Sequence, residues 1–320
     1  MMRLYSTLTV FMTSMGLLAT ILASGFGGEG SEIRSSSLAG SWYPADPDEL
    51  RAQLKNYLVQ AHVPKIEDNV LALISPHAGY RFSGQAAAYG FKAIMGRDYD
   101  RVIIIAPSHY ERFRGIGVSS YGYYQTPLGR VTVDENVGKN LSRHRLFTFK
   151  PEAEAQEHAV EIELPFLQLV QKNFKIVPLI VGELENDDLS AINGLLRPYI
   201  TEKTLIVVSS DFTHFGARFG YLPFRDNIKD NLEKLDRGAV DCILRKDNDG
   251  YFKYLRETGI TICGYFPIGI LLRLLPSDAK GVLLHYYTSG DLLNDYSSTV
   301  SYVSLLFHQP SVKQTKNATH

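Results

Sequence analysis

Runs of aliphatic and β-branched residues recur along the chain, separated by stretches in which apolar residues return every three or four positions. The runs are continuous rather than alternating, which is typical of strands buried on both faces of a sheet. They cover residues 70–74, 101–105, 175–181, 204–208, 281–284 and 298–303. The stretches between them predict helices over residues 48–60, 84–95, 158–172, 187–197, 226–246 and 267–275. This alternation predicts a single α/β domain whose central mixed, largely parallel sheet is covered by helices on both faces.

Two segments depart from this pattern. Residues 115–133 contain glycines, tyrosines and alternating positions, and we expect a hairpin or an excursion over the sheet there. At the N-terminus, a short positive end at Arg3 precedes an apolar run and small residues, an order typical of a secretory signal.

The expected organisation is therefore a signal peptide or N-terminal anchor over residues 1–30, the α/β domain over 31–308 and a flexible tail over 309–320. The leader predicts a protein that is exported, periplasmic or extracellular, or anchored in a membrane. A misassigned start codon would instead make the protein cytoplasmic.

Composition narrows the function classes. The 320 residues are 45% apolar and 21% charged, which excludes wholesale disorder. Lys and Arg total 33 and Asp and Glu total 34, so no excess positive charge is present to neutralise phosphates, and nucleic acid is not an expected partner. Two cysteines, Cys242 and Cys263, are too few for the disulfide framework of a small secreted domain.

Three of the predicted strands end in similar polar loops, which carry His77, then His109, then Asp211 with His214. In open α/β sheets, ligands bind beyond the carboxyl ends of the strands. The two first histidines are separated by about the length of one βαβ unit, so we expect them to emerge on the same edge from neighbouring strands. Histidines outside such loops are interpreted as surface or core residues: His62, His144, His285, His308 and His320.

Cys263 lies in a glycine-bearing turn directly before a predicted helix. A helix N-terminus lowers the pKa of a thiol and favours the thiolate, which suits a metal ligand or a nucleophile. Two other interpretations stay open, a small buried apolar side chain or a disulfide with Cys242, which itself lies on the apolar side of a predicted helix.

Two further pairs are candidates for chemistry. Asp211 and His214 are three residues apart and could transfer a proton together, the carboxylate orienting the imidazole; the alternative is a helix-capping aspartate beside an incidental histidine. Glu157 and His158 open a predicted helix and are candidates for lining a pocket.

The donor set limits the metals to be considered. Two histidines and one anionic residue with open coordination positions suit non-haem Fe(II). A thiolate in place of a carboxylate softens the site, so copper and Zn²⁺ are the alternatives.

Six blocks of residues, in order along the chain, resemble the Memo family, whose prokaryotic members are called AmmeMemoRadiSam system protein B. They are Leu38-Ala-Gly-Ser-Trp-Tyr-Pro44, Ser75-Pro-His-Ala-Gly-Tyr80 with Ser83-Gly84, Ala106-Pro-Ser-His109, Glu157-His158 with Glu161, Leu164 and Pro165, Ser209-Ser-Asp-Phe-Thr-His-Phe-Gly216, and Thr261-Ile-Cys-Gly264 with Pro267-Ile-Gly269. Any one block is weak evidence, whereas the ordered set is specific.

The resemblance implies a fold similar to that of the class III extradiol dioxygenases, which cleave catechol rings with Fe(II). It makes His77, His109 and Cys263 the metal ligands, with the cysteine standing where the dioxygenases use a glutamate. It places His214 at the acid/base position beside Asp211. Three residues of the matching blocks are then expected to line the substrate pocket: Glu157, His158 and Tyr80.

The chain also departs from the family. The animal relatives carry a basic pair after the Cys-Gly, where Tyr265 and Phe266 follow here, which argues against the phosphotyrosine-peptide binding ascribed to the animal branch. Family members are usually cytosolic, unlike a protein with a leader.

Three functions compete for these residues. The first is redox or dioxygenase-like chemistry on a small or phenolic substrate at a mononuclear metal centre, with iron as the expected metal. The second is a metal- or peptide-binding partner without turnover, working with a radical SAM protein as the family name suggests. The third is a Zn²⁺-dependent hydrolase with Asp211 or Glu157 as the base. The sequence identifies neither the substrate nor the oligomeric state.

Overall fold

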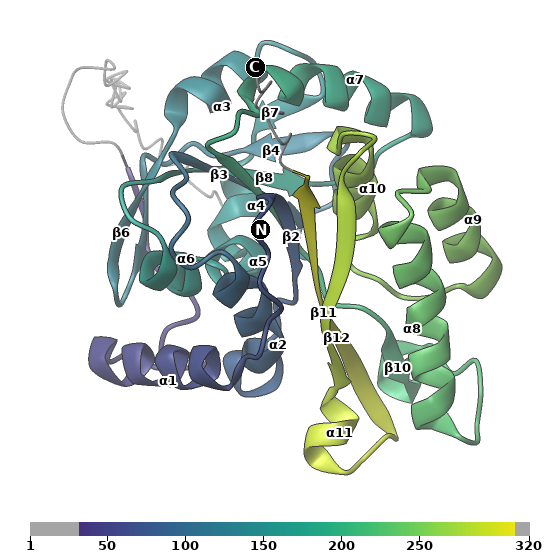
Figure 1. The fold of residues 1–320 in the computed structure, drawn as a ribbon. Helices are drawn as coiled ribbons and strands as arrows, with labels where there is room; N and C mark the ends of the chain where they lie inside the picture. The colour runs from purple at the N-terminus through teal and green to yellow at the C-terminus, as the bar shows by residue number, and fades with distance from the viewer. Residues whose placement is uncertain (1–31, 311–320) are drawn as a thin grey trace, which may run out of the picture. The chain divides into compact units, whose positions relative to one another are not determined.

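The computed structural model of the chain describes residues 32–310 (Figure 1). The predicted leader over residues 1–30 and all but the first two residues of the predicted tail lie outside this range. Within it, no helix combines the length and the apolar character needed to cross a membrane.

A twelve-stranded mixed sheet forms the centre of the molecule (Figure 1). Its five consecutive inner strands, in the order β6-β8-β3-β9-β2, pair in parallel, and β12 then pairs antiparallel with β2. The predicted α/β fold with a mixed, largely parallel sheet is thus confirmed. The strands are β1 Ile33–Arg34, β2 Asn69–Ser75, β3 Arg101–Pro107, β4 Ile116–Val118, β5 Tyr123–Thr126, β6 Gly129–Val133, β7 Phe147–Phe149, β8 Lys175–Val181, β9 Thr204–Ser209, β10 His214–Gly216, β11 Lys280–Thr288 and β12 Ser298–Gln309.

Helices cover both faces of this sheet. The helices are α1 Pro47–Gln60, α2 Tyr80–Ala93, α3 Glu135–Leu141, α4 Pro151–Gln156, α5 His158–Glu161, α6 Leu164–Val170, α7 Asn186–Leu196, α8 Ile228–Leu244, α9 Asn248–Thr258, α10 Tyr265–Leu274 and α11 Ser289–Leu293, with short 3-10 turns η1 Arg197–Tyr199 and η2 Ala217–Phe219. Apolar residues of α1, α2, α5 and α6 pack on one face, and those of α3 and α7 to α10 pack on the other.

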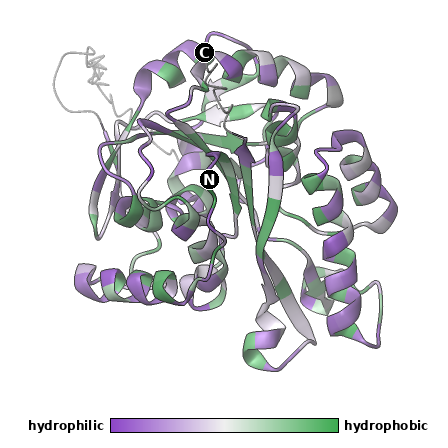
Figure 2. Ribbon diagram, in the orientation of Figure 1, coloured by the Kyte–Doolittle hydropathy of each residue, from purple (hydrophilic) through white to green (hydrophobic). Residues whose placement is uncertain are grey.

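Successive residues of the central strands pack alternately into the hydrophobic clusters on the two faces of the sheet. In β3, Val102 and Ile104 belong to the cluster under α1 and α2, whereas Ile103 and Ile105 belong to the opposite cluster. Because side chains alternate across a strand, a strand buried on both faces must be apolar throughout. Figure 2 shows the consequence, since the inner strands are almost entirely hydrophobic while the outer helices are hydrophilic on one side.

Local signals place the helix ends. Asp46 precedes α1, and its side chain accepts hydrogen bonds from the backbone N–H groups of Asp48 and Glu49, both at 2.9 Å. Pro47 occupies the first turn, where its missing N–H costs nothing. The single helix predicted over residues 158–172 is instead two helices, α5 and α6. Pro165 is the reason, because a proline cannot donate the helical hydrogen bond and is tolerated only in the first turn of the second helix.

Two predictions of arrangement need correction or refinement. β9 lies between β2 and β3, so the strands that precede His77 and His109 share an edge of the sheet but are not neighbours. Within residues 115–133, β5 and β6 form the expected hairpin. That segment is part of the sheet and not an excursion over it, because both β4 and β6 pair with β8.

Candidate metal centre

His77, His109 and Cys263 come together at the carboxyl edge of the sheet. Their candidate ligand atoms all lie within 4.8 Å of one another. The Sγ atom of Cys263 is 3.1 Å from Nε2 of His77, and the two imidazole rings are 5.0 Å apart between centroids. The loops after β2 and β3 supply the histidines, and the turn before α10 supplies the cysteine. The sequence-predicted donors therefore occupy one place.

Ser209, at the end of β9, and Asp211, in the loop that follows, form hydrogen bonds with His77. Its backbone N–H donates to Oδ1 of Asp211 at 2.8 Å, and its Nδ1 is 2.9 Å from Oγ of Ser209. The side chain is almost completely buried. Burial and the charge of nearby His109 lower the pKa of His77 well below its ordinary value, so this imidazole is neutral.

His109 is held by Glu157. The Oε2 atom of Glu157 accepts the backbone N–H of His109 at 2.8 Å, and Oε1 pairs with its Nδ1 at 2.8 Å. Oε1 also accepts the N–H of Ala159, which caps α5. Burial favours the protonated form of Glu157, but these hydrogen bonds lower its pKa below the ordinary value. Because both oxygens are engaged, Glu157 orients His109 from outside the donor cluster.

This arrangement satisfies a chemical test for a metal site. Ligand histidines in metalloproteins usually bind the metal through one ring nitrogen and donate from the other to a carboxylate or hydroxyl partner. Here the outer partner of each Nδ1 is present, Ser209 for His77 and Glu157 for His109. Each Nε2 is thereby left as the ligand atom, and the two histidines with Cys263 fit a transition-metal ion.

The turn around Cys263 is built by close backbone approach. The N–H of Asp211 donates to Sγ at 3.2 Å, and the N–H of Gly264 donates to Oγ of Ser210 at 2.9 Å. A Cβ at Gly264 would lie 2.5 Å from Ser210, so this position requires glycine. Both cysteines of the chain are free, so the structure does not have the disulfide between Cys242 and Cys263.

The protonation of the metal-free cluster differs from the sequence-based expectation. Burial raises the pKa of Cys263, and this effect exceeds the opposing influence of His109 and of the Ser210 hydroxyl. For His109, burial acts to lower the pKa, but hydrogen bonds to Cys263 and Glu157 raise it to about 10. A proton therefore occupies this pair at neutral pH, where a metal ion would replace it.

No hydrogen bond joins the side chains of His214 and Asp211 in the described part of the chain, although the charge of His214 opposes the rise that burial causes in the pKa of Asp211. The Nδ1 of His214 bonds with the carbonyl oxygen of Thr261 at 3.1 Å, and its backbone N–H donates to the hydroxyl of the same residue. The backbone N–H of His77 donates to the carboxylate of Asp211, so Asp211 shapes the ligand loop. A carbonyl therefore orients the His214 ring, because the extended β10 turns the imidazole towards the 261–263 segment.

Of the residues expected to line the pocket, Tyr80 does not. Its ring packs in the core against Tyr43 and Phe166, it is 2% exposed, and its hydroxyl donates to the carbonyl of Ile162. As the first residue of α2, it turns towards the helices instead of the edge of the sheet.

His158, by contrast, is part of the centre. Its ring stacks on His109 at 4.3 Å and contacts Trp42 at 4.7 Å. The hydroxyl of Tyr110 lies 3.2 Å from its Nδ1. Burial and the charge of His109 lower the pKa of His158 to about 4, so it forms a neutral, aromatic wall.

Two cavities need to be compared as binding places. One of about 160 Å³ adjoins Cys263 and is walled by Phe113, Tyr265 and Phe266, with Arg112 and Glu183 also lining it. The residues that depart from the family pattern thus lie beside the donor cluster.

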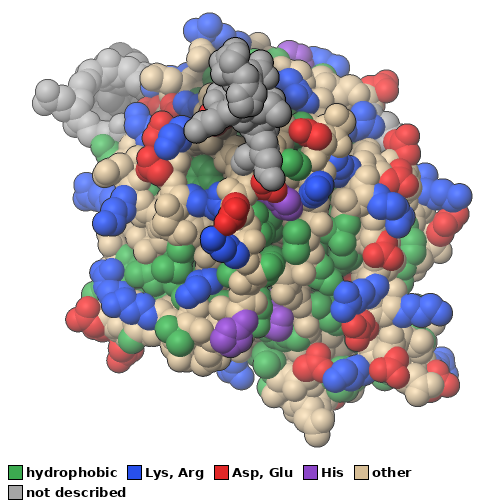
Figure 3. Space-filling model, viewed as in Figure 1, with side chains coloured by type: hydrophobic (Ala, Val, Ile, Leu, Met, Phe, Trp, Pro, Cys, Tyr) green, Lys and Arg blue, Asp and Glu red, His purple; other side chains and the backbone are tan. Residues whose placement is uncertain are grey.

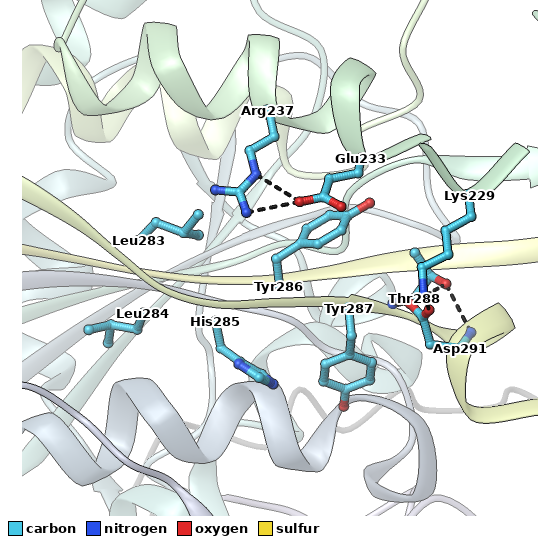
Figure 4. A pocket seen from close by; sticks show the side chains of 10 residues that line it. All are labelled: Lys229, Glu233, Arg237, Leu283, Leu284, His285, Tyr286, Tyr287, Thr288 and Asp291. Atoms are coloured by element: carbon cyan, nitrogen blue, oxygen red, sulfur yellow. Dashed lines mark hydrogen bonds and ion pairs between the residues drawn. The ribbon is translucent and has the colours of Figure 1, made fainter. Parts of the chain in front are cut away.

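The other cavity, of about 550 Å³, is a groove along β11 and contains none of the predicted site residues (Figure 4). Its charges pair with each other, Arg237 with Glu233 and Lys229 with Asp291. On this side of the molecule, cationic and anionic side chains are interspersed (Figure 3).

The sequence did not reveal the residues that orient the candidate ligands and His214. Ser209 and Thr261 were visible as members of motifs, but only the folded chain shows that they orient His77 and His214. Glu163, almost fully buried near Ser209, was not singled out. Its position in the sequence could have indicated a role, because a glutamate inside the apolar stretch 159–167 has to be paired or functional.

The chain is similar to several known proteins. The sequence model of the family described as Memo-like protein matches residues 34–306. The protein memo-1 homolog of Caenorhabditis elegans is 34% identical, over 94% of this chain and 93% of its own. MEMO1 family protein TV1383 of Thermoplasma volcanium is 31% identical (86% and 98%), and Protein MEMO1 of Homo sapiens is 32% identical (85% and 96%). The crystal structure of uncharacterized protein JW3007 from Escherichia coli K12 aligns with 73% of this chain and 98% of its own at 12% identity, with a TM-score of 0.46.

Proposed function

Because the chain belongs to the family of Memo-like proteins, we propose that it is a mononuclear iron protein that performs redox chemistry on a small or phenolic substrate. His77, His109 and Cys263 are the proposed ligands. The observation that carries this proposal is the convergence of three donor atoms within 4.8 Å while each histidine has its other nitrogen anchored. Two histidines and one anionic donor leave coordination positions open, which suits Fe(II).

An iron(II) ion bound there supplies a redox couple and open positions for small ligands. The protein supplies the surroundings. The aromatic rings of Trp42 and His158 form a wall beside His109, and Tyr265 and Phe266 wall the cavity of about 160 Å³ next to Cys263. A cavity of that size favours a small substrate.

His214 is the proposed proton carrier. A carbonyl oxygen only accepts hydrogen bonds, so Nδ1 of His214 carries the proton in its bond to Thr261. Its Nε2 is then the nitrogen that takes a proton from a substrate hydroxyl. Asp211 supports this role indirectly, because it fixes the loop of His77.

The test is metal analysis of the full-length chain purified without oxygen, beside His77→Ala and Cys263→Ala. His285→Ala is the matched control, because that histidine stacks on Tyr89 in the β11 groove. Near-stoichiometric iron that is lost in both site variants and kept in the control supports the proposal. Zinc or copper with the same pattern contradicts iron, and no metal after reconstitution contradicts the metal centre.

The redox part has its own measurement. Oxygen consumption with phenolic substrates should depend on iron, and His214→Ala should lower the turnover number while the protein keeps its metal. Turnover that survives this substitution unchanged contradicts the role of His214.

Cys263 favours one second candidate, a metal- or peptide-binding partner protein without turnover that works with a radical SAM protein. The dioxygenases that the family resembles use a glutamate at this position, and a thiolate changes the chemistry. Tight metal binding without turnover across substrate classes supports this candidate. A zinc hydrolase is less well supported, because the carboxylates of Asp211 and Glu157 already accept backbone N–H groups.

A further inference from the structure

Glu163 is a buried acid that the proposed function does not yet use. It lies at the junction of α5 and α6, is 1% exposed, and its Oε1 has no hydrogen-bond partner among the residues described. The hydroxyl of Ser75 is buried as well. An unpaired buried polar group costs about 1–3 kcal/mol, so an unpaired carboxyl oxygen in the core points to a function.

The surroundings of Glu163 connect it to the ligand His77. Ser75 and Ser209 stand opposite each other at the ends of β2 and β9. Both hydroxyls act on the Glu163 carboxyl and favour its charged form. The hydroxyl of Ser209 is in turn 2.9 Å from Nδ1 of His77. Glu163, Ser209 and His77 therefore form a row that leads from the core to the donor cluster.

The direction of the hydrogen bonds in this row follows from the ligand atom. If Nε2 of His77 binds a metal, Nδ1 must carry the proton and donate it to Oγ of Ser209. The hydroxyl hydrogen of Ser209 is then free to donate, and the Glu163 carboxyl is the acceptor next to it.

The electrostatic surroundings of Glu163 favour a neutral carboxyl in the metal-free protein, which can still accept a hydrogen bond. Burial raises the pKa of Glu163 to about 8, with nearby Asp211 acting in the same direction. A carboxyl kept neutral in this way costs less to bury in the metal-free protein than a carboxylate would.

On the basis of the proposed function, we propose that Glu163 is a positioning residue that fixes the ring orientation and tautomer of His77 through the Ser209 hydroxyl. His109 has the same kind of support without an intermediary, because Glu157 contacts its Nδ1 directly. The two carboxyl groups come from one short stretch of chain, in which Glu157 directly precedes α5 and Glu163 directly precedes α6.

The test uses Co²⁺ as an optical probe of the metal centre in the full-length chain. Glu163→Leu and Ser209→Ala should each weaken Co²⁺ binding by about 10- to 100-fold, the usual loss when an outer partner of a ligand is removed. Glu163→Gln should keep most of the affinity, because its amide oxygen still accepts the Ser209 hydroxyl. The double variant of Glu163→Leu and Ser209→Ala should be no weaker than either single variant, because the two residues act in one row.

Two further readouts separate positioning from a structural role. The Co²⁺ absorption spectrum should shift in Glu163→Leu, whereas the free energy of unfolding of the metal-free protein should not fall. Glu154→Leu is the matched control, since Glu154 is equally buried but bonds to Tyr124 and Ser120. It should leave the spectrum and the affinity of the folded protein unchanged.

Three outcomes overturn the proposal. An unchanged Co²⁺ affinity and spectrum in Glu163→Leu, with binding still lost in His77→Ala, overturns the role of Glu163 alone. An unchanged affinity in Ser209→Ala does the same if Glu163→Leu fails to fold. A wild-type chain that binds no Co²⁺ overturns the role of Glu163 together with the metal centre.

Discussion

Two buried polar clusters include residues of α5 or of its N-cap, and they are built in opposite ways. In one, which we call the arginine cluster, the carboxylate of Glu161 accepts hydrogen bonds from Arg34 at 2.6 Å and from the Tyr43 hydroxyl at 2.6 Å. The hydroxyl of Ser36 and the backbone N–H groups of Ser37 and Leu38 donate to it as well. Every lone pair of this carboxylate is used.

The guanidinium of the arginine cluster is equally satisfied. Arg34 is 2% exposed, and its remaining N–H groups donate to the backbone carbonyls of Glu154 and Glu157 at 2.9 and 2.7 Å. The cluster thereby ties the first described strand and the segment up to Tyr43 onto α4 and α5. A buried ion pair with all its hydrogen bonds made contributes to holding one structure, and it offers no atom to a ligand.

The metal centre has the converse pattern. The outer nitrogens of His77 and His109 are bonded, but their inner nitrogens and the sulfur of Cys263 face one another. Without a metal, a proton shared by His109 and Cys263 joins the inner atoms of this centre. The comparison of the two clusters indicates that a complete set of permanent hydrogen bonds marks a structural role, whereas ligand atoms joined only by a replaceable proton mark a place for a metal.

The largest expected effect is on stability, in the arginine cluster. Arg34→Met should lower the free energy of unfolding by about 3–5 kcal/mol, because it leaves the Glu161 carboxylate buried without its cation. Urea unfolding of the metal-free protein measures this. Metal affinity should change less than stability does, and a larger loss of affinity than of stability would remove the distinction between the clusters.

The next effect is on metal binding, in the metal centre. Cys263→Ser should weaken metal binding by roughly a hundred- to a thousandfold, since a single ligand contributes about 2.5–4 kcal/mol when about 10–16 kcal/mol is shared among four. The free energy of unfolding without metal should stay within about 1 kcal/mol of wild type, because serine is nearly the same size. Chelator competition and urea unfolding give the two values, and a stability loss as large as that of Arg34→Met would contradict the comparison.

A smaller effect on metal affinity is expected for Glu157, which contacts no metal itself but hydrogen bonds to the ligand His109. Glu157→Gln should weaken metal binding by about 10- to 100-fold, because an amide supports the His109 ring less strongly than a carboxylate does. Glu152→Gln, at an exposed glutamate of α4, is the matched control and should bind metal as wild type does. Equal affinities for Glu157→Gln and the control would show that His109 needs no charged partner.

The two clusters also show which features of the fold and of the site could be predicted from the sequence alone. Cys263 was indicated by its glycine-bearing turn before a predicted helix. The strand-end rule found His77 and His109, because it depends on local runs that the structure reproduces. It could not find the insertion of β9 between β2 and β3, since strand order depends on long-range packing.

Contacts between residues far apart in the sequence could not be predicted either, because they too depend on long-range packing. Arg34 and Glu161 are 127 residues apart, and nothing local to either indicates the pairing. Tyr80 begins the helix after the His77 loop, and Asp211 lies in the loop after β9, yet the direction of each side chain depends on neighbours from other elements. Motifs therefore predicted which loops form the centre, and packing decided which side chains enter it.

The two clusters should also differ in their pH dependence. In the arginine cluster, burial acts to raise the pKa of Glu161, but the charge of Arg34 and the hydrogen bonds that the carboxylate accepts hold it below its ordinary value. Its contribution to stability is therefore complete above the ordinary pKa of a glutamate and is lost only as the pH falls through the lowered value. Between pH 6 and pH 9, this cluster should contribute a constant amount.

In the metal centre, the pKa of His109 is raised to about 10, so a proton stabilises the metal-free fold fully below the ordinary histidine pKa, and that stabilisation is lost as the pH rises through about 10. The metal needs the same nitrogen unprotonated. Each bound ion should therefore displace at least one proton, and affinity should rise about tenfold per pH unit between pH 6 and pH 9. Co²⁺ titration in buffers of matched ionic strength measures this slope. A flat profile would mean that no proton competes with the metal, and that the two clusters do not differ in the way their hydrogen bonds indicate.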